Sequence, residues 1–148
     1  DPSSRVPCLA RCPSLIEPGT VSDALLQITD LTATCIEVAT GDANATAHLP
    51  GSPAKSLIGH WSNPAQKHRD YVYSEDGGQF LPPYQMIRDE RWKYVLYTAD
   101  GRELLFDMTA DPHEQHNLAG DVEHIAVKDE LKSRLLSHLA ETPTPLRD

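Results

Sequence analysis

The chain has 148 residues, enough for one domain with a modest core, and its formal net charge is −9. This acidic surplus argues against a nucleic-acid partner, because a phosphate backbone repels negative charge. The chain contains no run of about 18 apolar residues, so we expect no membrane-spanning segment.

The first expected elements are a strand and a helix. Residues 5–13 (RVPCLARCP) are apolar or small on both faces, which is typical of a strand inside a larger sheet. After an extended stretch over residues 22–28, Asp30 is expected to cap a helix that runs to Thr40 and stops at Gly41. The expected apolar face of that helix consists of Leu31, Cys35, Val38 and Ala39.

Residues 42–66 are rich in Ala, Ser, Asn, Pro and Gly, which predicts a loop with one helical turn over residues 54–58. From residue 71 the composition favours strands, and four are expected. Asp100-Gly101 predicts a hairpin turn, because glycine accepts the positive φ that a tight turn needs. The predicted strands are residues 71–74, 84–88, 92–98 and 103–108.

The last part of the chain predicts a capped turn and a helix. Asp111, Pro112 and Glu114 have the spacing of a helix start with a capping box. Asp121 is expected to cap a final helix that ends near Ala140, with an apolar stripe that should pack on the sheet. That stripe consists of Val127, Leu131 and Leu135, flanked by Ile125, Leu136 and Leu139.

Residues 103–120 (ELLFDMTADPHEQHNLAG) resemble a C-terminal signature of type I sulfatases, members of the alkaline phosphatase superfamily. In that signature a strand ending Leu-Tyr-Asp-Leu precedes Asp-Pro-x-Glu-x-x-Asn-Leu. Other segments resemble the family in the same order, although Ala33 stands where the family usually has proline. These segments are residues 5–13, 16–22, 29–34, 69–75 and 86–94.

The resemblance implies a chemistry that this chain does not contain. Sulfatases use a formylglycine made within a Cys/Ser-x-Pro-Ser-Arg motif and a calcium ion held by Asp and Asn or Gln side chains. Cys12-Pro13-Ser14-Leu15 lacks both the spacer and the arginine. We therefore expect no catalytic residue, no metal site and no cofactor in this chain, and no activity from it alone.

Three residues are candidates for substrate contact within a complete enzyme: Glu75, Asp76 and His60. The two carboxylates precede Gly77-Gly78 on a loop that can approach the substrate pocket in related enzymes, although solvated loop residues are the alternative. His113 and His116 are three apart in a turn without an evident third ligand, which favours a surface turn over a metal site. A solvated sheet face is expected for Arg88, Arg91 and Lys93.

We expect an α+β fold, with a four-stranded antiparallel sheet and a C-terminal helix packed on it, preceded by a strand–helix remnant of a larger α/β domain. The remnant should span residues 1–66 and the sheet subdomain residues 67–148. The predicted function is the C-terminal part of a sulfatase-like sulfuric ester hydrolase. The alternative is a non-catalytic module derived from a sulfatase. That module would fold independently and self-associate or bind a partner. The partners that we expect for the chain are a second copy, meeting through residues 5–13 or the helix from Asp30, or the missing catalytic sulfatase domain.

Overall fold

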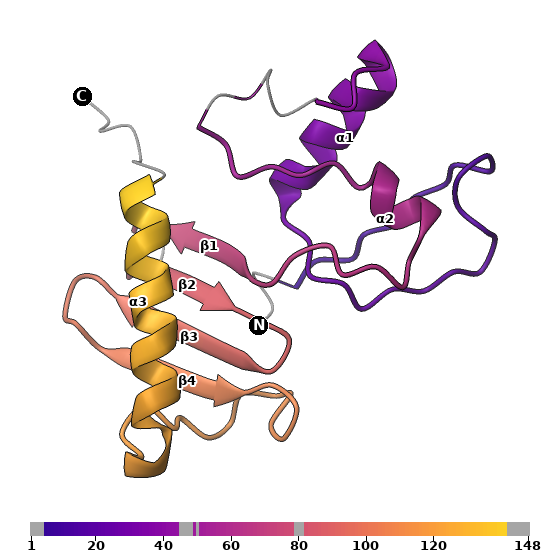
Figure 1. The fold of residues 1–148 in the computed structure, drawn as a ribbon. Coiled ribbons are helices and arrows are strands. Elements are labelled where there is room, and N and C mark those ends of the chain that lie inside the picture. Colours follow the sequence, from indigo (N-terminus) through magenta and orange to yellow (C-terminus); the bar gives the residue numbers. More distant parts are fainter. Residues whose placement is uncertain (1–4, 45–48, 50, 79–81, 142–148) are drawn as a thin grey trace. The chain divides into compact units, whose positions relative to one another are not determined.

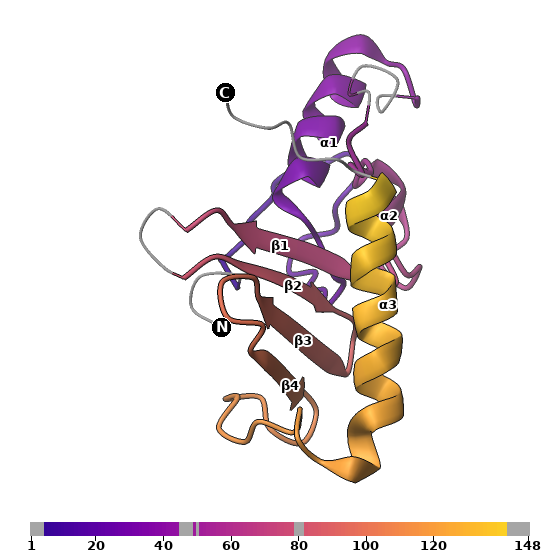
Figure 2. The same cartoon turned by 90° about the vertical axis from the view of Figure 1, so that its left-hand side faces the viewer.

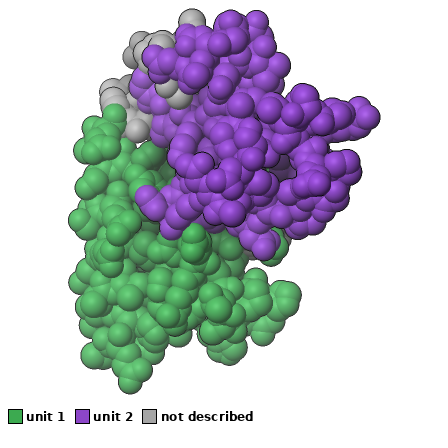
Figure 3. All heavy atoms as spheres, turned by 45° about the vertical axis from the view of Figure 1, so that its right-hand side comes forward, with its two compact units in different colours: residues 1–6, 71–148 green, residues 7–70 purple. Residues whose placement is uncertain are grey.

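The computed structural model describes residues 5–44, 49, 51–78 and 82–141 of the chain. The chain forms two compact units. One consists of Pro7–Asp70, and the other of Tyr71–Asp148 together with Asp1–Val6 (Figure 3). We call them the helix–loop unit and the sheet unit. Each has its own architecture.

The sheet unit contains four strands that follow one another in space in the order of the sequence. They are β1 (Val72–Asp76), β2 (Tyr84–Arg88), β3 (Trp92–Tyr97) and β4 (Glu103–Asp107), and each neighbouring pair is antiparallel (Figure 1). The predicted four-stranded antiparallel sheet is thereby confirmed.

The tight turns of the sheet form at residues whose side chain or backbone conformation favours a turn. Between β2 and β3, the Asp89 carboxylate accepts hydrogen bonds from the backbone N–H groups of Arg91 (2.8 Å) and Trp92 (2.6 Å). Between β3 and β4, Gly101 has a φ of 72°, a left-handed conformation that glycine adopts without strain. These turns bring consecutive strands into antiparallel register.

A long helix, α3 (Ile125–Glu141), crosses one face of the sheet (Figure 2). It follows a single 3₁₀ turn, η2 (Val122–His124), which the Asp121 carboxylate caps by accepting from the Glu123 N–H at 3.1 Å. The predicted stripe is confirmed at its centre, although the flanking Ile125 and Leu136 are 44% and 50% exposed. Leu131 and Leu135 are buried. They form one core with Ile87, Tyr94 and Leu105 of the sheet.

The opposite face of the sheet is also buried, which corrects the expectation of a solvated face at Lys93. Met86, Val95 and Phe106 on that face are each less than a tenth exposed. The Lys93 side chain is 7% exposed, and its Nζ donates to Glu114 Oε2 at 2.9 Å. A buried lysine requires such a partner, because an unpaired charge is costly to desolvate.

The loop after β4 does not begin with a capped helix, so the predicted capping box is wrong. Glu114 adopts a φ of 56°, outside the helical region, and directs its carboxylate to Lys93. Asp111 instead accepts from the backbone N–H of His116 at 2.8 Å. The ion pair with a buried lysine outweighs the local preference for a helix start.

The helix–loop unit contains α1 (Ile28–Thr40) and the short α2 (Ile58–Ser62). The end of α1 at Gly41, with a φ of 71°, is as predicted. Its start differs, because Gln27 is the N-cap and Asp30 lies in the first turn and accepts from the Gln27 N–H at 3.0 Å. The turn predicted over residues 54–58 is displaced to α2.

The face of α1 that packs inward is the reverse of the predicted one. Asp30, Ala33 and Thr34 are the buried residues of the helix, whereas Ile28 and Val38 are 74% and 66% exposed. Hydrophobic periodicity locates an apolar face but does not say what that face contacts.

Residues 5–12 have no regular secondary structure, so the predicted strand over residues 5–13 is not present in this structure. Leu9 is 98% exposed. A strand requires hydrogen bonds from a neighbouring strand, and the described part of the chain pairs none with this segment.

Within the described residues, no helix has the length and apolarity that crossing a bilayer would demand.

Candidate functional site

Glu75 and Asp76 are the last two residues of β1. Glu75 is exposed, and its Oε2 accepts from the Tyr73 hydroxyl at 2.7 Å. Asp76 Oδ1 accepts from the Gly78 N–H at 2.7 Å and so shapes the turn that leaves the strand. Adjacent residues of a strand point to opposite faces, so these two carboxylates do not form an acid–base pair.

Asp76 lies in a row of polar and aromatic side chains at one end of the sheet. The strand register places Asp76 opposite Tyr84, and Tyr84 opposite Tyr97. The centroids of the two tyrosine rings are 6.3 Å apart. Cζ of Arg102 lies 4.2 Å from the centroid of the Tyr97 ring. The row therefore combines a carboxylate, two phenols and a guanidinium, groups that can hydrogen-bond and stack on a polar ligand.

His60 of α2 is 7% exposed, and both of its ring nitrogens are engaged. Nδ1 lies 2.9 Å from the Gln66 carbonyl oxygen, and Nε2 lies 2.9 Å from Ser22 Oγ. Because a carbonyl only accepts, Nδ1 donates its proton to Gln66, and in the neutral ring Nε2 accepts from the Ser22 hydroxyl. In this structure His60 joins two loops of the helix–loop unit, and contact with a substrate would require breaking one of these bonds.

Asp30, which the sequence did not identify as a site residue, has many polar partners within the described residues. Its carboxylate is fully buried and accepts from two backbone N–H groups, those of Gln27 (3.0 Å) and Lys55 (2.9 Å). It also accepts from His68 Nε2 at 3.2 Å and from Arg69 through both Nε, at 2.8 Å, and Nη2. This bidentate arginine contact is geometrically the most specific of the set.

The groups around Asp30 are bonded to one another and to the backbone. Lys55 Nζ donates to the His68 carbonyl oxygen at 2.5 Å, and Arg69 Nη2 donates to the Pro53 carbonyl oxygen at 2.6 Å. Thr34 Oγ1 donates to the Asp30 carbonyl oxygen at 2.6 Å. We call this cluster the Asp30 network. Its members are Asp30, Thr34, Lys55, His68 and Arg69.

The electrostatics of the Asp30 network favour a charged carboxylate and a neutral imidazole. Burial alone would raise the pKa of Asp30, but hydrogen bonds from Arg69 and two backbone N–H groups hold that pKa below its ordinary value. Burial lowers the pKa of His68, against the attraction of the neighbouring Asp30 charge. Because every partner of Asp30 donates to it, the carboxylate acts as a fixed acceptor rather than as a proton-transfer group.

No group of three or more His, Cys, Asp or Glu side chains is placed to hold a metal ion in the described part of the chain. His113 and His116 are exposed, and the nearest carboxylate to His116 Nδ1 is Asp111 at 3.6 Å. This geometry agrees with the surface turn that the sequence favoured.

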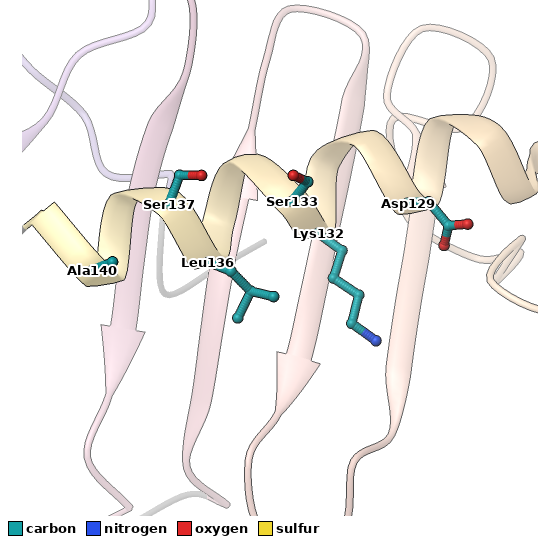
Figure 4. Close-up of a pocket in the computed structure, with 6 residues that line it drawn as sticks. All are labelled: Asp129, Lys132, Ser133, Leu136, Ser137 and Ala140. Atoms are coloured by element: carbon teal, nitrogen blue, oxygen red, sulfur yellow. The ribbon is translucent and has the colours of Figure 1, made fainter.

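A shallow hollow lies along the solvent side of α3 (Figure 4). All the residues that line it belong to that one helix, so no second element encloses a ligand. They are Asp129, Lys132, Ser133, Leu136, Ser137 and Ala140. An enclosed pocket usually requires walls from several elements, so this hollow is a surface groove rather than an active site.

Comparison with known proteins gives a consistent result. Residues 1–141 match the family model described as "N-sulphoglucosamine sulphohydrolase, C-terminal". The chain is 26% identical, over 90% of its length, to the ulvan-active sulfatase of Formosa agariphila, and 32% identical, over 81%, to arylsulfatase K of Xenopus laevis. It spans only 32% and 23% of these two proteins.

Two solved structures have the same fold over 89% of the chain. The phosphonate monoester hydrolase SpPMH from Silicibacter pomeroyi matches with a TM-score of 0.65 and 25% identity. A protein solved in complex with its substrate D-glucosamine-2-N,6-O-disulfate matches with a TM-score of 0.75 and 22% identity, a likeness of fold alone. The chain spans 28% and 27% of these two proteins.

Proposed function

Because the chain belongs to the N-sulphoglucosamine sulphohydrolase C-terminal family, we propose that it acts as the C-terminal part of a sulfatase-like sulfuric ester hydrolase whose catalytic groups lie outside it. One observation carries the proposal. The family match spans residues 1–141, yet the chain accounts for only 32% and 23% of the two sulfatases described above.

The residues of this chain do not fit the family's formylglycine and calcium. Its closest approach to the nucleophile motif, Cys12-Pro13-Ser14-Leu15, lacks the arginine. Asp30, the buried carboxylate of the helix–loop unit, has its oxygens occupied by hydrogen-bond donors rather than open to a cation. The nucleophile and the metal would therefore come from a catalytic portion.

The proposed contribution of this chain is contact with a sulfated saccharide. One relative is named an ulvan-active sulfatase, and one protein of similar fold was solved with a glucosamine disulfate. Asp76 could accept hydrogen bonds from sugar hydroxyls, while Tyr84 and Tyr97 provide ring surface and Arg102 a cation for a sulfate group. Glu75 is exposed beside this row, and we retain it as a contact residue.

The test is an assay of the purified chain with an aryl sulfate and with D-glucosamine-2-N,6-O-disulfate. We expect no turnover from the chain alone, and turnover when it is mixed with the portion of the F. agariphila sulfatase that lies outside the match. Turnover by the chain alone, abolished by a point substitution within it, would contradict the proposal. The same sulfatase portion without the chain is the control.

The alternative is a non-catalytic module that folds by itself. The closed core of the sheet unit favours it, because Ile87, Tyr94, Leu105 and Leu135 are fully buried within that unit. This alternative predicts a cooperatively folded chain that does not bind the sulfatase portion. A binding measurement on the same two proteins therefore distinguishes the two functions.

A further inference from the structure

An exposed serine and a buried histidine are hydrogen-bonded to each other in the helix–loop unit. Ser22 Oγ lies 2.9 Å from His60 Nε2, although 38 positions separate the two residues in the chain. Ser22 is exposed, whereas His60 is 7% exposed. The contact therefore places a hydroxyl at the surface with a buried imidazole as its hydrogen-bond partner.

The backbone determines which nitrogen of the His60 ring carries the proton. Nδ1 lies 2.9 Å from the Gln66 carbonyl oxygen, and because a carbonyl only accepts, Nδ1 is the protonated nitrogen. In that tautomer the lone pair of Nε2 faces Ser22, and the hydroxyl donates to it. A nucleophile bonded to a base, with the base oriented by a third group, is the arrangement that activates a hydroxyl for attack.

Further contacts hold the serine and the histidine in this geometry. The ring of His60 packs against the ring of His68, a member of the Asp30 network, with the two centroids 5.8 Å apart. Ser22 Oγ accepts from the backbone N–H of Ala24 at 3.1 Å. This N–H stabilises the negative charge that develops on Oγ as its proton leaves. The nucleophile and the base are therefore positioned before a substrate arrives.

We propose that Ser22 and His60 form a hydrolytic site that cleaves aryl esters of short carboxylic acids. Ser22 Oγ attacks the carbonyl carbon while its proton passes to His60 Nε2. The bond from that carbon to the phenolic oxygen breaks, and the phenol leaves with the proton from Nε2. Water then attacks the acyl group on Oγ and gives a proton to Nε2, which returns it to Oγ as the carboxylic acid departs. The inference goes beyond the proposed function and does not depend on it, because no sulfate ester takes part.

The exposure of Ser22 determines the substrate class. Because the hydroxyl lies at the surface, a substrate that reaches it receives few contacts from the chain. Such a site supplies little binding energy to lower the barrier, so the bond that breaks must be labile in itself. An aryl ester meets this condition, because a phenolate is a good leaving group, whereas an amide does not.

A fluorophosphonate tests the nucleophile directly, because it phosphonylates serine hydroxyls that a base activates and releases fluoride. The control within the same chain is Ser133, an exposed serine whose neighbours one turn away on α3 are Asp129 and Ser137 rather than a histidine. We expect Ser22 to be labelled about tenfold faster than Ser133 or more, as measured by peptide mass spectrometry of the full chain. Equal labelling rates would overturn the inference.

Hydrolysis of p-nitrophenyl acetate tests turnover. Free thiols attack the same ester, so the parent protein is the full chain with Cys8→Ala, Cys12→Ala and Cys35→Ala. In that background we expect Ser22→Ala to lower the rate of p-nitrophenolate release above the spontaneous rate by about tenfold or more. Ser133→Ala should leave the rate unchanged. A Ser22→Ala variant that kept the parent rate would contradict the proposed site.

His60→Gln distinguishes a base from a merely structural contact. The glutamine amide can still hydrogen-bond to Ser22 but takes up no proton at neutral pH. A variant that keeps the helical circular dichroism of the wild type should lose the fluorophosphonate label on Ser22, and retained labelling would overturn the role of His60. Ser22→Ala changes an exposed side chain and leaves His60 in place, so its result decides the inference even if His60→Gln fails to fold.

Discussion

The interiors of the two units of this chain differ in what they bury. The sheet unit buries mostly hydrocarbon, with Leu131 and Leu135 of α3 packed on Ile87, Tyr94 and Leu105 of the sheet. Its ion pair of Lys93 with Glu114 lies outside that core. The helix–loop unit buries a charge, places the Asp30 network at its centre and leaves the apolar side of α1 exposed. The first is organised around a hydrophobic core, whereas the second is organised around the hydrogen bonds of one buried carboxylate.

This difference has an energetic consequence. Apolar burial is non-directional and is shared among many contacts, so it tolerates modest changes of shape. A buried ion pair contributes little net stability but sets a unique geometry, and removal of one partner is strongly destabilising. The helix–loop unit should therefore depend on one residue to a degree that the sheet unit does not.

The largest expected effect is that of Asp30→Ala. The substitution leaves the Arg69 guanidinium without its bidentate partner and removes the acceptor for three other groups, at a cost of about 3–5 kcal/mol. We expect the amides of α1 to exchange rapidly while those of β3 remain protected. Hydrogen exchange read by mass spectrometry measures both in one experiment.

The control for Asp30→Ala is Asp23→Ala, an exposed aspartate of the same unit. A surface substitution of this kind should change the free energy of unfolding by about 0.5 kcal/mol or less. If Asp30→Ala left the protection of α1 intact, the helix–loop unit would not depend on its buried charge, and the contrast between the units would fail.

The second effect belongs to the sheet unit. Leu135 is fully buried and Leu136 is 50% exposed, so two neighbouring residues of α3 form a matched pair. Leu135→Ala should lower the free energy of unfolding of the sheet unit by about 2–5 kcal/mol, through lost burial and the cavity left behind. Leu136→Ala should change it by about 0.5 kcal/mol or less. Urea unfolding followed by tryptophan fluorescence measures both, and equal effects would show that the orientation of α3 is wrong.

The sequence predicted the sheet unit well because its signals are local. Alternation over residues 92–97 identifies β3, and Asp100-Gly101 specifies the turn to β4 by backbone conformation alone. The stripe of α3 follows from residue spacing along one helix. Each of these features lies within a few residues of the chain, so no knowledge of distant contacts is needed.

The helix–loop unit could be predicted only in part because its contacts are long-range. The end of α1 at Thr40 was predicted, but its N-cap lies three residues before the predicted one and its inward face was reversed. Asp30 accepts from Lys55, His68 and Arg69, which are separated from it by 25, 38 and 39 positions. No spacing rule connects residues so far apart. Residues 5–13 show the same limit, because strand propensity does not supply a partner strand.

The candidate contact residues also divide into those that a local pattern identifies and those that only the folded structure identifies. Glu75 and Asp76 were identified from a carboxylate pair before two glycines, a local pattern. Their companions Tyr84 and Tyr97 were not identified, because only the strand register brings them opposite Asp76. Arg102 joins them through its position over the Tyr97 ring. The register was predictable in principle from the turns, but the assembly of these side chains into one row was not.

The smallest expected effect concerns Glu103 of β4, a carboxylate with a strongly lowered pKa. It accepts from Lys132 Nζ at 2.8 Å and from the Tyr94 hydroxyl at 2.7 Å, and Lys128 Nζ lies 3.3 Å from it. The hydrogen bond from Lys132, then that from Tyr94, lowers the pKa of Glu103 from 4.5 to about 2. The charged form is therefore stabilised by folding.

The pH dependence follows from the sign of that shift. Because the folded pKa of Glu103 lies below the unfolded one, its contribution is fully present above pH 4.5 and is lost as the pH falls toward 2. Glu103→Gln should lower the free energy of unfolding of the sheet unit by about 0.2–1 kcal/mol at pH 7, since the lysines are partly solvated, and by less at pH 3. Urea unfolding at the two pH values measures this. If Glu103→Gln cost the sheet unit as much as Leu135→Ala, that unit would also depend on a single carboxylate, and hydrocarbon burial would no longer distinguish it from the helix–loop unit.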